Sequence, residues 1–336
     1  MADDQNLQIL LREAPRGSLQ PEHFESRTVS RPAPEEGEVL VRSLLLSLDA
    51  ANRAWMQGAT YKSAVEEGDV MHGYAIGEVV ESKAAGFSQG DIVAGELGWQ
   101  QYAAMPARQL VKCPDVEPLT HLHSVLGIAG KTAYHGLLNV SGINEGETLL
   151  VSAAGGSVGS IVGQIGKIKG AHVVGIAGGP EKCAWVTDTL GFDACIDYKN
   201  QDVAAELRST CPNGVDVYFD NVGGPILQAA LFAMNLRGRV ACCGAVSQYD
   251  TAEPRSPAGI PGLLVVKRIR MEGFIVMDFA DQDEQAIADL ARWSNEGKLT
   301  VAEDIVEGLV NAPAGLIGLL AGENRGKRMV RVATRS

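Results

Sequence analysis

The segment that most constrains the fold lies at 149–170 and reads LLVSAAGGSVGSIVGQIGKIKG. A short apolar run enters a glycine-rich turn, and apolar residues then recur at helical spacing, at Val158, Ile161, Val162, Ile165 and Ile168. This spacing predicts a helix with one apolar stripe that packs on a sheet. Gly156 would let the backbone approach a pyrophosphate, and Gly159 would let the helix pack closely on the strand. The segment is therefore typical of a dinucleotide-binding turn, with Ala154 in place of the first glycine of the usual motif.

Strand-like runs alternate with helix-length stretches beyond this turn. The runs are LLVSA, HVVGIA, ACIDY, VDVYFD, RVACCG and MEGFIV, and the expected helices cover 157–169, 180–190, 201–210 and 224–235. Such alternation predicts right-handed βαβ units and a doubly wound parallel sheet of the Rossmann type. Residues 249–262, with three prolines, are expected to form a loop at the ligand-binding edge of that sheet.

The rest of the chain has a different pattern. Short apolar stretches separated by Gly, Pro and Asp over 37–112 indicate a β-rich domain. A charged helix is expected at 281–297, followed by a strand-like TVAEDIVEG, a short helix near 312–321 and the strand-like KRMVRVA. Because six strands already serve the parallel sheet, we expect this tail to return to the first domain.

Charge and composition exclude several classes of partner. The net charge of −12 disfavours nucleic acid and anionic membranes as main partners, since both would repel the chain. No apolar run approaches the ~18 residues that a membrane span needs, and the start MADDQNLQ lacks the features of a signal peptide. The six cysteines show no C-x-x-C pair, which favours reduced, buried thiols. We therefore expect a cytoplasmic protein.

The stretch GIAGGPEK, at 175–182, lies where a NAD-binding fold usually presents a carboxylate to the adenosine ribose. Here glycines and Lys182 occupy that place, with Pro180 suited to the first helical position. Lys182 could be an ordinary solvated lysine. The alternative, which we favour, is that Lys182 faces a 2′-phosphate, and this predicts NADPH rather than NAD.

Metal-ligand and hydrolase patterns are missing from the sequence. His72 is followed by Gly-Tyr rather than a glutamate, Ser47-Leu-Asp49 lacks a cysteine, and no run of four cysteines could hold a structural zinc. His121 and His123 are expected to make surface or core contacts rather than bind metal. No G-x-S-x-G occurs. Hydride chemistry without a metal is easier to arrange for an activated C=C bond than for an alcohol, because the negative charge passes to a carbonyl oxygen as an enolate.

Several longer stretches resemble one enzyme family. They are GDIVAGELGWQQYA, GKTAYHGLL, GETLLVSAAGGSVGSIVGQIGKIKG, DVYFDNVGG, CGAVSQY, RMEGFIV and GENRGKRMV. The chain is similar over nearly its whole length to zinc-free members of the medium-chain dehydrogenase/reductase superfamily, in particular to the prostaglandin reductase and alkenal double-bond reductase family.

This resemblance implies a fold and a set of site residues. The fold would be a Rossmann domain at 124–299 and a β-rich, GroES-like catalytic domain formed by 1–123 and completed by 300–336, and homodimers are usual in the family. Implied cofactor contacts are Gly156, Ser157, Val158 and Gly159 for the pyrophosphate, Lys182 and Tyr198 for the 2′-phosphate side, and Asn221, Cys243, Gly244, Ala245, Ser247, Tyr249, Phe274, Ile275, Val276 and Asn324 elsewhere.

Tyr249 matches a tyrosine proposed in similar reductases to assist proton delivery, although it could simply line the pocket. The substrate side departs from the family pattern S-x-D-P-Y-M-R, because 47–53 reads SLDAANR. Asn52 and Tyr61 are the residues we expect at the substrate pocket.

The expected function is NADPH-dependent reduction of the C=C bond of α,β-unsaturated aldehydes or ketones. Two alternatives stay open: an NADPH quinone reductase, and a non-catalytic protein that binds NADPH as a sensor.

Overall fold

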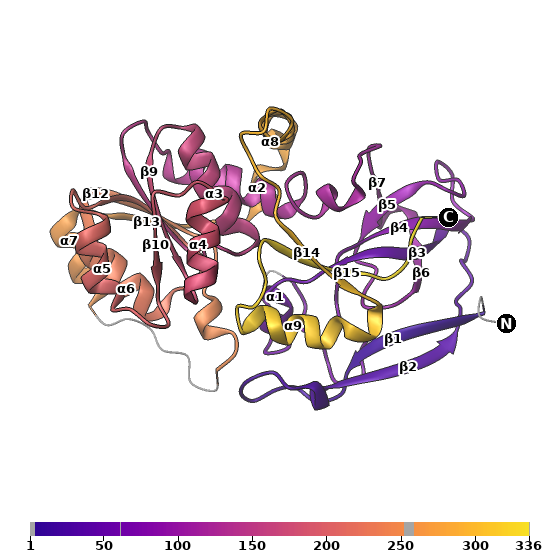
Figure 1. Ribbon diagram of the computed structural model, residues 1–336. Coiled ribbons are helices and arrows are strands. Elements are labelled where there is room, and N and C mark those ends of the chain that lie inside the picture. Colours follow the sequence, from indigo (N-terminus) through magenta and orange to yellow (C-terminus); the bar gives the residue numbers. More distant parts are fainter. Residues whose placement is uncertain (1–3, 61, 252–258, 336) are drawn as a thin grey trace.

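The computed structural model describes residues 4–60, 62–251 and 259–335, which form two domains side by side (Figure 1). One is built on a six-stranded parallel sheet, and the other on a seven-stranded sheet with a separate two-stranded hairpin. The predicted fold class is confirmed. The domain boundaries given above stay a prediction.

The β-rich domain starts with a hairpin of β1 (Gln5–Leu11) and β2 (Phe24–Ser30). Its larger sheet has the order β14-β15-β3-β4-β5-β7, with β6 pairing β3. The N-terminal strands of this sheet are β3 (Glu38–Ser47), β4 (Ala75–Ser82), β5 (Ile92–Gly95), β6 (Tyr102–Pro106) and β7 (Val111–Lys112).

The C-terminal tail completes this larger sheet, as the surplus strands predicted. Strand β15 (Lys327–Arg331) pairs antiparallel with β3, and β14 (Glu303–Glu307) pairs parallel with β15. Helix α9 (Ala312–Leu320) joins them and packs Leu316 into the core of the β-rich domain.

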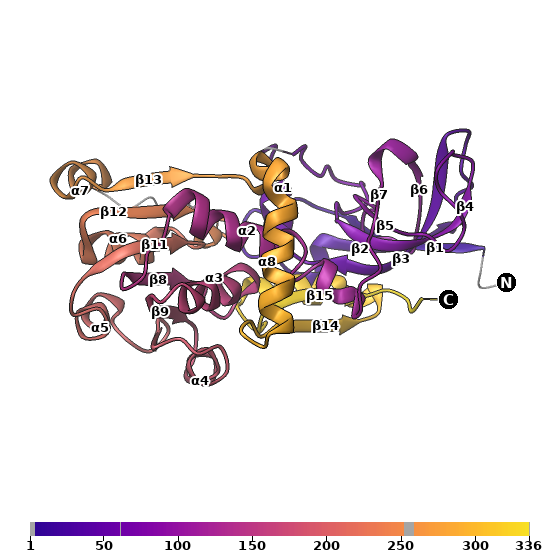
Figure 2. The same ribbon diagram turned by 90° about the horizontal axis from the view of Figure 1, so that it is seen from above.

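The parallel sheet has the strand order β10-β9-β8-β11-β12-β13. Its strands are β8 (Thr148–Ser152), β9 (His172–Ala177), β10 (Ala194–Asp197), β11 (Val215–Asp220), β12 (Met234–Cys242) and β13 (Arg270–Gly273). Its helices are α2 (Ile128–Tyr134), α3 (Ser157–Ile168), α4 (Pro180–Asp188), α5 (Val203–Thr210), α6 (Gly224–Ala233), α7 (Ile260–Lys267) and α8 (Asp283–Asn295) (Figure 2).

Both faces of the parallel sheet are buried, as parallel sheets require. Leu149 and Val151 of β8 pack in the core under α3, whereas Leu150 between them packs in the core under α5 and α6. Cys242 and Cys243 likewise pack on opposite cores, and burial raises the pKa of each thiol to about 12. The two neighbouring side chains therefore pack on opposite faces of the sheet.

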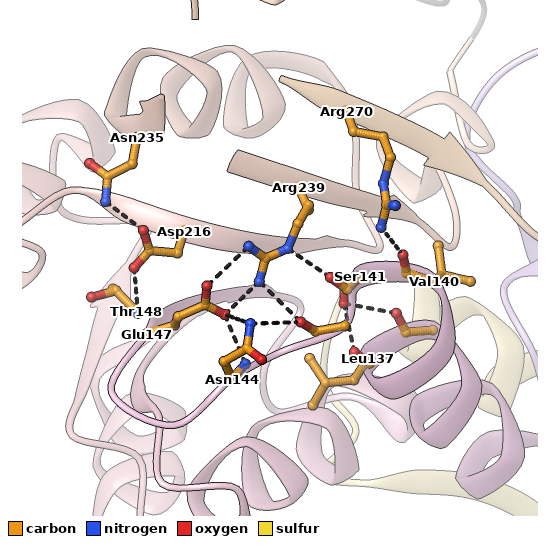
Figure 3. A network of polar contacts seen from close by, with 12 residues as sticks. Leu137, Val140, Ser141, Asn144, Glu147, Thr148, Asp216, Asn235, Arg239 and Arg270 are labelled. Carbon is orange, nitrogen blue, oxygen red and sulfur yellow. Dashed lines mark hydrogen bonds and ion pairs between the residues drawn. The ribbon is translucent and has the colours of Figure 1, made fainter. Parts of the chain in front are cut away.

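A polar network closes the amino ends of the central strands (Figure 3). Arg239 pairs with Glu147 at 3.0 Å and donates to the Ser141 carbonyl at 2.7 Å, and Arg270 donates to the Val140 carbonyl. These carbonyls end a helical segment, so the arginines satisfy acceptors that a helix C-terminus leaves open. The network lies at the amino ends of the strands, and the predicted site lies at their carboxyl ends.

Several parts of the fold were not predicted, helix α2 among them. The β1–β2 hairpin precedes the first expected strand. Helix α7 begins at Ile260, so the expected loop over 249–262 is wrong at its end; residues 252–258 lie outside the described part of the chain. Gly259 is in the left-handed region and Pro261 occupies the first turn of α7. Proline favours a helix start as readily as a loop, which is why composition misjudged this stretch.

Candidate functional site

The glycine turn connects β8 to α3 at the carboxyl edge of the sheet. Gly156 is the N-cap of α3, and Ala153 is held at a φ of 49° to make the turn. A Cβ on Gly159 would lie 2.3 Å from the Ala153 carbonyl oxygen. The helix start therefore touches the turn backbone, and any side chain at 159 would separate them.

The start of α3 has unused hydrogen-bonding capacity. The Ser157 hydroxyl is buried and has no hydrogen-bond partner among the described residues. The first amides of a helix also lack partners within it, and they carry the positive end of the helix dipole. An anion as large as a pyrophosphate would accept hydrogen bonds from the Ser157 hydroxyl and from these amides. The predicted residues Gly156 to Gly159 therefore fit such a group.

The C-terminal tail is hydrogen-bonded to this turn. The Gly326 amide donates to the Gly155 carbonyl at 2.9 Å, and Gly156 and Gly326 form a parallel bridge. Asn324 is buried beside it and donates to the Gly326 carbonyl at 2.8 Å. Sequence reasoning identified Asn324 and missed both Gly155 and Gly326 as contacts. Only the returning tail brings them together.

Lys182 lies in the first turn of α4, as predicted, with Gly179 as the N-cap. Its ammonium donates to the carbonyls of Gly322 and Asn324, each at 2.5 Å. Its aliphatic chain rests on the glycine turn, since a Cβ on Gly155 would lie 2.8 Å from the Lys182 Cδ. Lys182 thus joins α4, the turn and the tail.

More cations surround Lys182 than the sequence suggested. Burial, together with the charges of Lys199 and Arg325, lowers the pKa of Lys182 to about 8. The carbonyl partners bring no negative charge and Asp304 offsets only part of this repulsion, so a bound phosphate would relieve it further. Tyr198 is 44% exposed and lies with Lys199 over Gly178. Lys199 and Arg325 each follow a predicted residue directly, which is the signal that could have found them.

The carboxyl ends of β8, β11 and β12 are joined by hydrogen bonds. The Asn221 amide nitrogen donates to the Ser152 hydroxyl at 2.9 Å, and its side chain donates to the Ser152 carbonyl at 2.8 Å. The amides of Cys243 and Gly244 donate to the Asp220 carbonyl, and Ser247 donates to the Val222 carbonyl. These predicted residues therefore line one edge of the sheet in fixed positions.

Tyr249 follows a short helical turn after β12. Its hydroxyl oxygen accepts a hydrogen bond from the Ala245 amide at 3.2 Å, so its ring folds back over the strand-end loop. Three predicted residues follow β13 at the same ends of the strands, namely Phe274, Ile275 and Val276. The Phe274 ring packs edge-on against the Phe219 ring, with 6.1 Å between the ring centroids. All of the predicted cofactor residues thus lie at this edge or on the tail beside it.

The predicted substrate residues are less informative. Asn52 is buried in α1 (Ala51–Trp55), where its side chain accepts from the Asp49 amide at 2.9 Å and donates to the His72 carbonyl at 3.0 Å. Tyr61 lies outside the described residues. Asn52 therefore lies in the β-rich domain with its side-chain amide already engaged in hydrogen bonds.

Of the two closely spaced histidines, His123 makes a core contact. His123 is buried with its Nε2 3.0 Å from the Leu45 carbonyl oxygen, and burial lowers its pKa to about 4. No group of three or more His, Cys, Asp or Glu side chains within the described residues is placed to hold a metal ion. Nor does this part of the chain contain a helix long and apolar enough to cross a membrane.

Comparison with known proteins shows the family to which this chain belongs. Residues 7–113 match the model of an N-terminal domain of oxidoreductases, and residues 157–293 match the model of a zinc-binding dehydrogenase family. An NADPH-dependent curcumin reductase of Escherichia coli (strain K12) is 43% identical over 98% of this chain and 97% of its own length. The chain belongs to the alkenal reductase family of the medium-chain dehydrogenase/reductase superfamily.

Two further members of the family match nearly the full length. An NADP(+)-dependent 2-alkenal reductase of Nicotiana tabacum is 38% identical over 98% of both chains. The crystal structure of CurA from Vibrio vulnificus in complex with NADPH superposes with a TM-score of 0.93 at 41% identity, covering 98% of this chain and 99% of that one. The similarity to the family drawn from the sequence motifs is thus confirmed.

Proposed function

We propose that this chain is an NADPH-dependent reductase of the C=C bond of α,β-unsaturated aldehydes and ketones. The observation that carries the proposal is the full-length match to a 2-alkenal reductase in a chain that has a cluster of cationic side chains around Lys182, beside the glycine turn. The match supports the reaction, and the cationic cluster supports the choice of NADPH over NADH.

The residues of the site divide the binding task. The start of α3 with Ser157 would hold the pyrophosphate, and Lys182, Tyr198, Lys199 and Arg325 would hold the 2′-phosphate. Bound NADPH supplies a hydride for the β-carbon of the substrate. We assign to Tyr249 the donation of a proton to the resulting enolate; the assignment is supported by its hydroxyl, whose oxygen accepts from Ala245 so that its own O–H remains to be donated.

A panel of acceptors tests the reaction. The full-length protein is mixed with NADPH and one of three acceptors: an enal, a linear enone or a para-quinone. A fourth mixture contains NADP and an alcohol, and nicotinamide absorbance is followed in each. We expect the enal and enone to be reduced with the highest kcat/KM. Preference for the quinone would instead favour a quinone reductase, and tight NADPH binding without turnover on any acceptor would favour the sensor.

We also propose that the protein is a homodimer. Strand β13 is an edge of the parallel sheet, and the neighbouring helix α7 exposes Val265 (75%) and Val266 (68%) at the end of the molecule far from the β-rich domain (Figure 1). An exposed sheet edge beside apolar side chains is suited to pairing with a second copy. Sedimentation should give a dimer, and Val265→Asp should shift it toward monomer; a monomeric wild type would contradict this assignment.

A further inference from the structure

Tyr249 and Asp250 are held by two side chains and one backbone amide of the other domain. The Asp250 carboxylate accepts from Arg53 Nε at 3.0 Å and from the Leu19 amide at 2.8 Å. The Tyr249 carbonyl accepts from the Gln57 side chain at 2.8 Å. Arg53 belongs to α1 and Gln57 lies two residues beyond its end, whereas Tyr249 and Asp250 follow β12 of the parallel sheet. All three contacts therefore cross from one domain to the other.

Arg53 is a buried cation prepared for this contact. Its side chain is fully buried, and its Nη2 donates to the carbonyls of Pro15 and Gly17 at 3.2 and 2.7 Å. Those carbonyls fix the guanidinium from within the β-rich domain but bring no negative charge. Among the described residues Asp250 is the carboxylate that pairs with it. Loss of the Asp250 carboxylate from this contact would leave the Arg53 charge buried and uncompensated, which is strongly unfavourable.

Tyr249 is consequently tied to both domains. Its hydroxyl is bonded to Ala245 in the strand-end loop of the parallel sheet, and its carbonyl is bonded to Gln57 of the β-rich domain. The bond to Gln57 can form only while the two domains are in contact, whereas the bond to Ala245 lies within the loop itself. The position of the tyrosine side chain therefore depends on the inter-domain contact as well as on its own loop.

We propose that Arg53, Gln57 and Asp250 form a latch that holds the two domains closed and thereby positions Tyr249 for proton delivery. They are positioning residues and need not touch the substrate. The catalytic part of this inference rests on the proposed role of Tyr249, whereas the closing part does not.

A double-mutant cycle tests the catalytic part. Gln57→Met removes the bond to the Tyr249 carbonyl at nearly constant volume. In the full-length enzyme it should lower kcat about tenfold, because small displacements of a reacting group are costly, and leave KM for NADPH within about twofold. In a Tyr249→Phe background, Gln57→Met should have no further effect on kcat. Gln89→Met, at an exposed glutamine outside the latch, is the control.

Equal losses of kcat from Gln57→Met in both backgrounds would overturn positioning through Tyr249. An unchanged kcat for Gln57→Met in the wild-type background would overturn it as well. If Tyr249→Phe alone has no effect, the proposed role of Tyr249 fails, and with it the catalytic part of the latch.

Amide hydrogen exchange tests the closing part without any turnover. Asp250→Asn keeps the shape of the side chain but removes the charge that pairs with Arg53. We expect exchange several-fold faster at Leu19 and over 246–250 in this variant, and unchanged exchange over 149–170. Asp115→Asn, at an exposed carboxylate outside the latch, should change neither. Wild-type exchange at Leu19 and over 246–250 in Asp250→Asn would overturn the latch even if the enone is reduced.

Discussion

The two ends of the candidate site are built in different ways. Around the glycine turn, anion binding depends on backbone groups, glycines and one helix start, all within about thirty residues of one another except for the tail. Around Tyr249, the arrangement depends on side chains that come from both domains, and the Arg53–Asp250 pair spans 197 residues of sequence. The glycine turn and the helix start of the first region are local properties of the chain, to which the tail is added, whereas the second region exists only where the two domains meet. Changes in the first should act on cofactor binding, and changes in the second on turnover.

The largest effect is expected from Tyr249→Phe. Removing the O–H proposed to protonate the enolate should lower kcat with NADPH and an enone about 100-fold, the lower end of what a positioned proton donor contributes. KM for NADPH should change little, and Tyr102→Phe in the β-rich domain serves as the control. If kcat stays at its wild-type value, Tyr249 only lines the pocket and the contrast between the two regions breaks down.

Gly159→Ala should be nearly as damaging, but to binding. The new Cβ would lie 2.3 Å from the Ala153 carbonyl oxygen, so α3 must shift away from the turn. Overpacking of this kind costs about 2 kcal/mol, or about 30-fold in NADPH affinity or an equivalent loss of stability. Titration of NADPH and thermal unfolding would measure both. Gly262→Ala is the matched control because nothing lies within 4 Å of its Cβ. Wild-type NADPH affinity and wild-type thermal stability in Gly159→Ala would show that the turn can accommodate a methyl group.

Lys182→Ala tests whether Lys182 makes the protein prefer NADPH over NADH. The variant loses a charge-assisted hydrogen bond to the 2′-phosphate, so KM for NADPH should rise about tenfold while KM for NADH stays within about twofold. Lys83→Ala, at an exposed lysine of the β-rich domain, should change neither. Equal increases for both cofactors would mean that Lys182 holds the tail through its carbonyl partners and does not recognise the phosphate.

The smallest effect concerns pH. The pKa of Lys182 is lowered from 10.5 to about 8, so its ammonium is lost as the pH rises through about 8. A bound phosphate favours the charged form, and NADPH binding should therefore take up a proton above pH ~8 and weaken about fivefold between pH ~7 and ~9. Calorimetry in buffers of different ionisation enthalpy measures both quantities. NADH should lack this dependence, and so should Lys182→Ala; a slope retained by the variant would assign it to another group.

Much of the parallel-sheet domain followed from the sequence. The strand runs and the helical spacing at Val158, Ile161 and Ile165 are local patterns, and the structure places α3 and the other predicted helices of that domain close to their expected bounds. The helix start at Pro180 was predictable for the same reason, since proline and the preceding glycine act on their own backbone. Helix α7 escaped prediction because the same two residue types also make loops.

The neighbours of Lys182 were beyond the reach of local patterns. Its acceptors, the carbonyls of Gly322 and Asn324, lie 140 and 142 residues away, and backbone carbonyls have no residue-type signature. The bond between Gly326 and Gly155 is hidden in the same way. A sequence pattern marks which residue carries a charge, but it does not state what surrounds that charge.

The sequence by itself determined the alternating architecture, the dinucleotide turn, the place of Lys182 and the return of the tail, because each depends on periodicity, on backbone-restricted residues or on the number of strands. Only the tertiary structure decided how the tail closes over the turn, why Lys182 has a lowered pKa, and which buried cation meets Asp250. Those features depend on burial and on distances between segments far apart in the chain, and both arise when the two domains pack together.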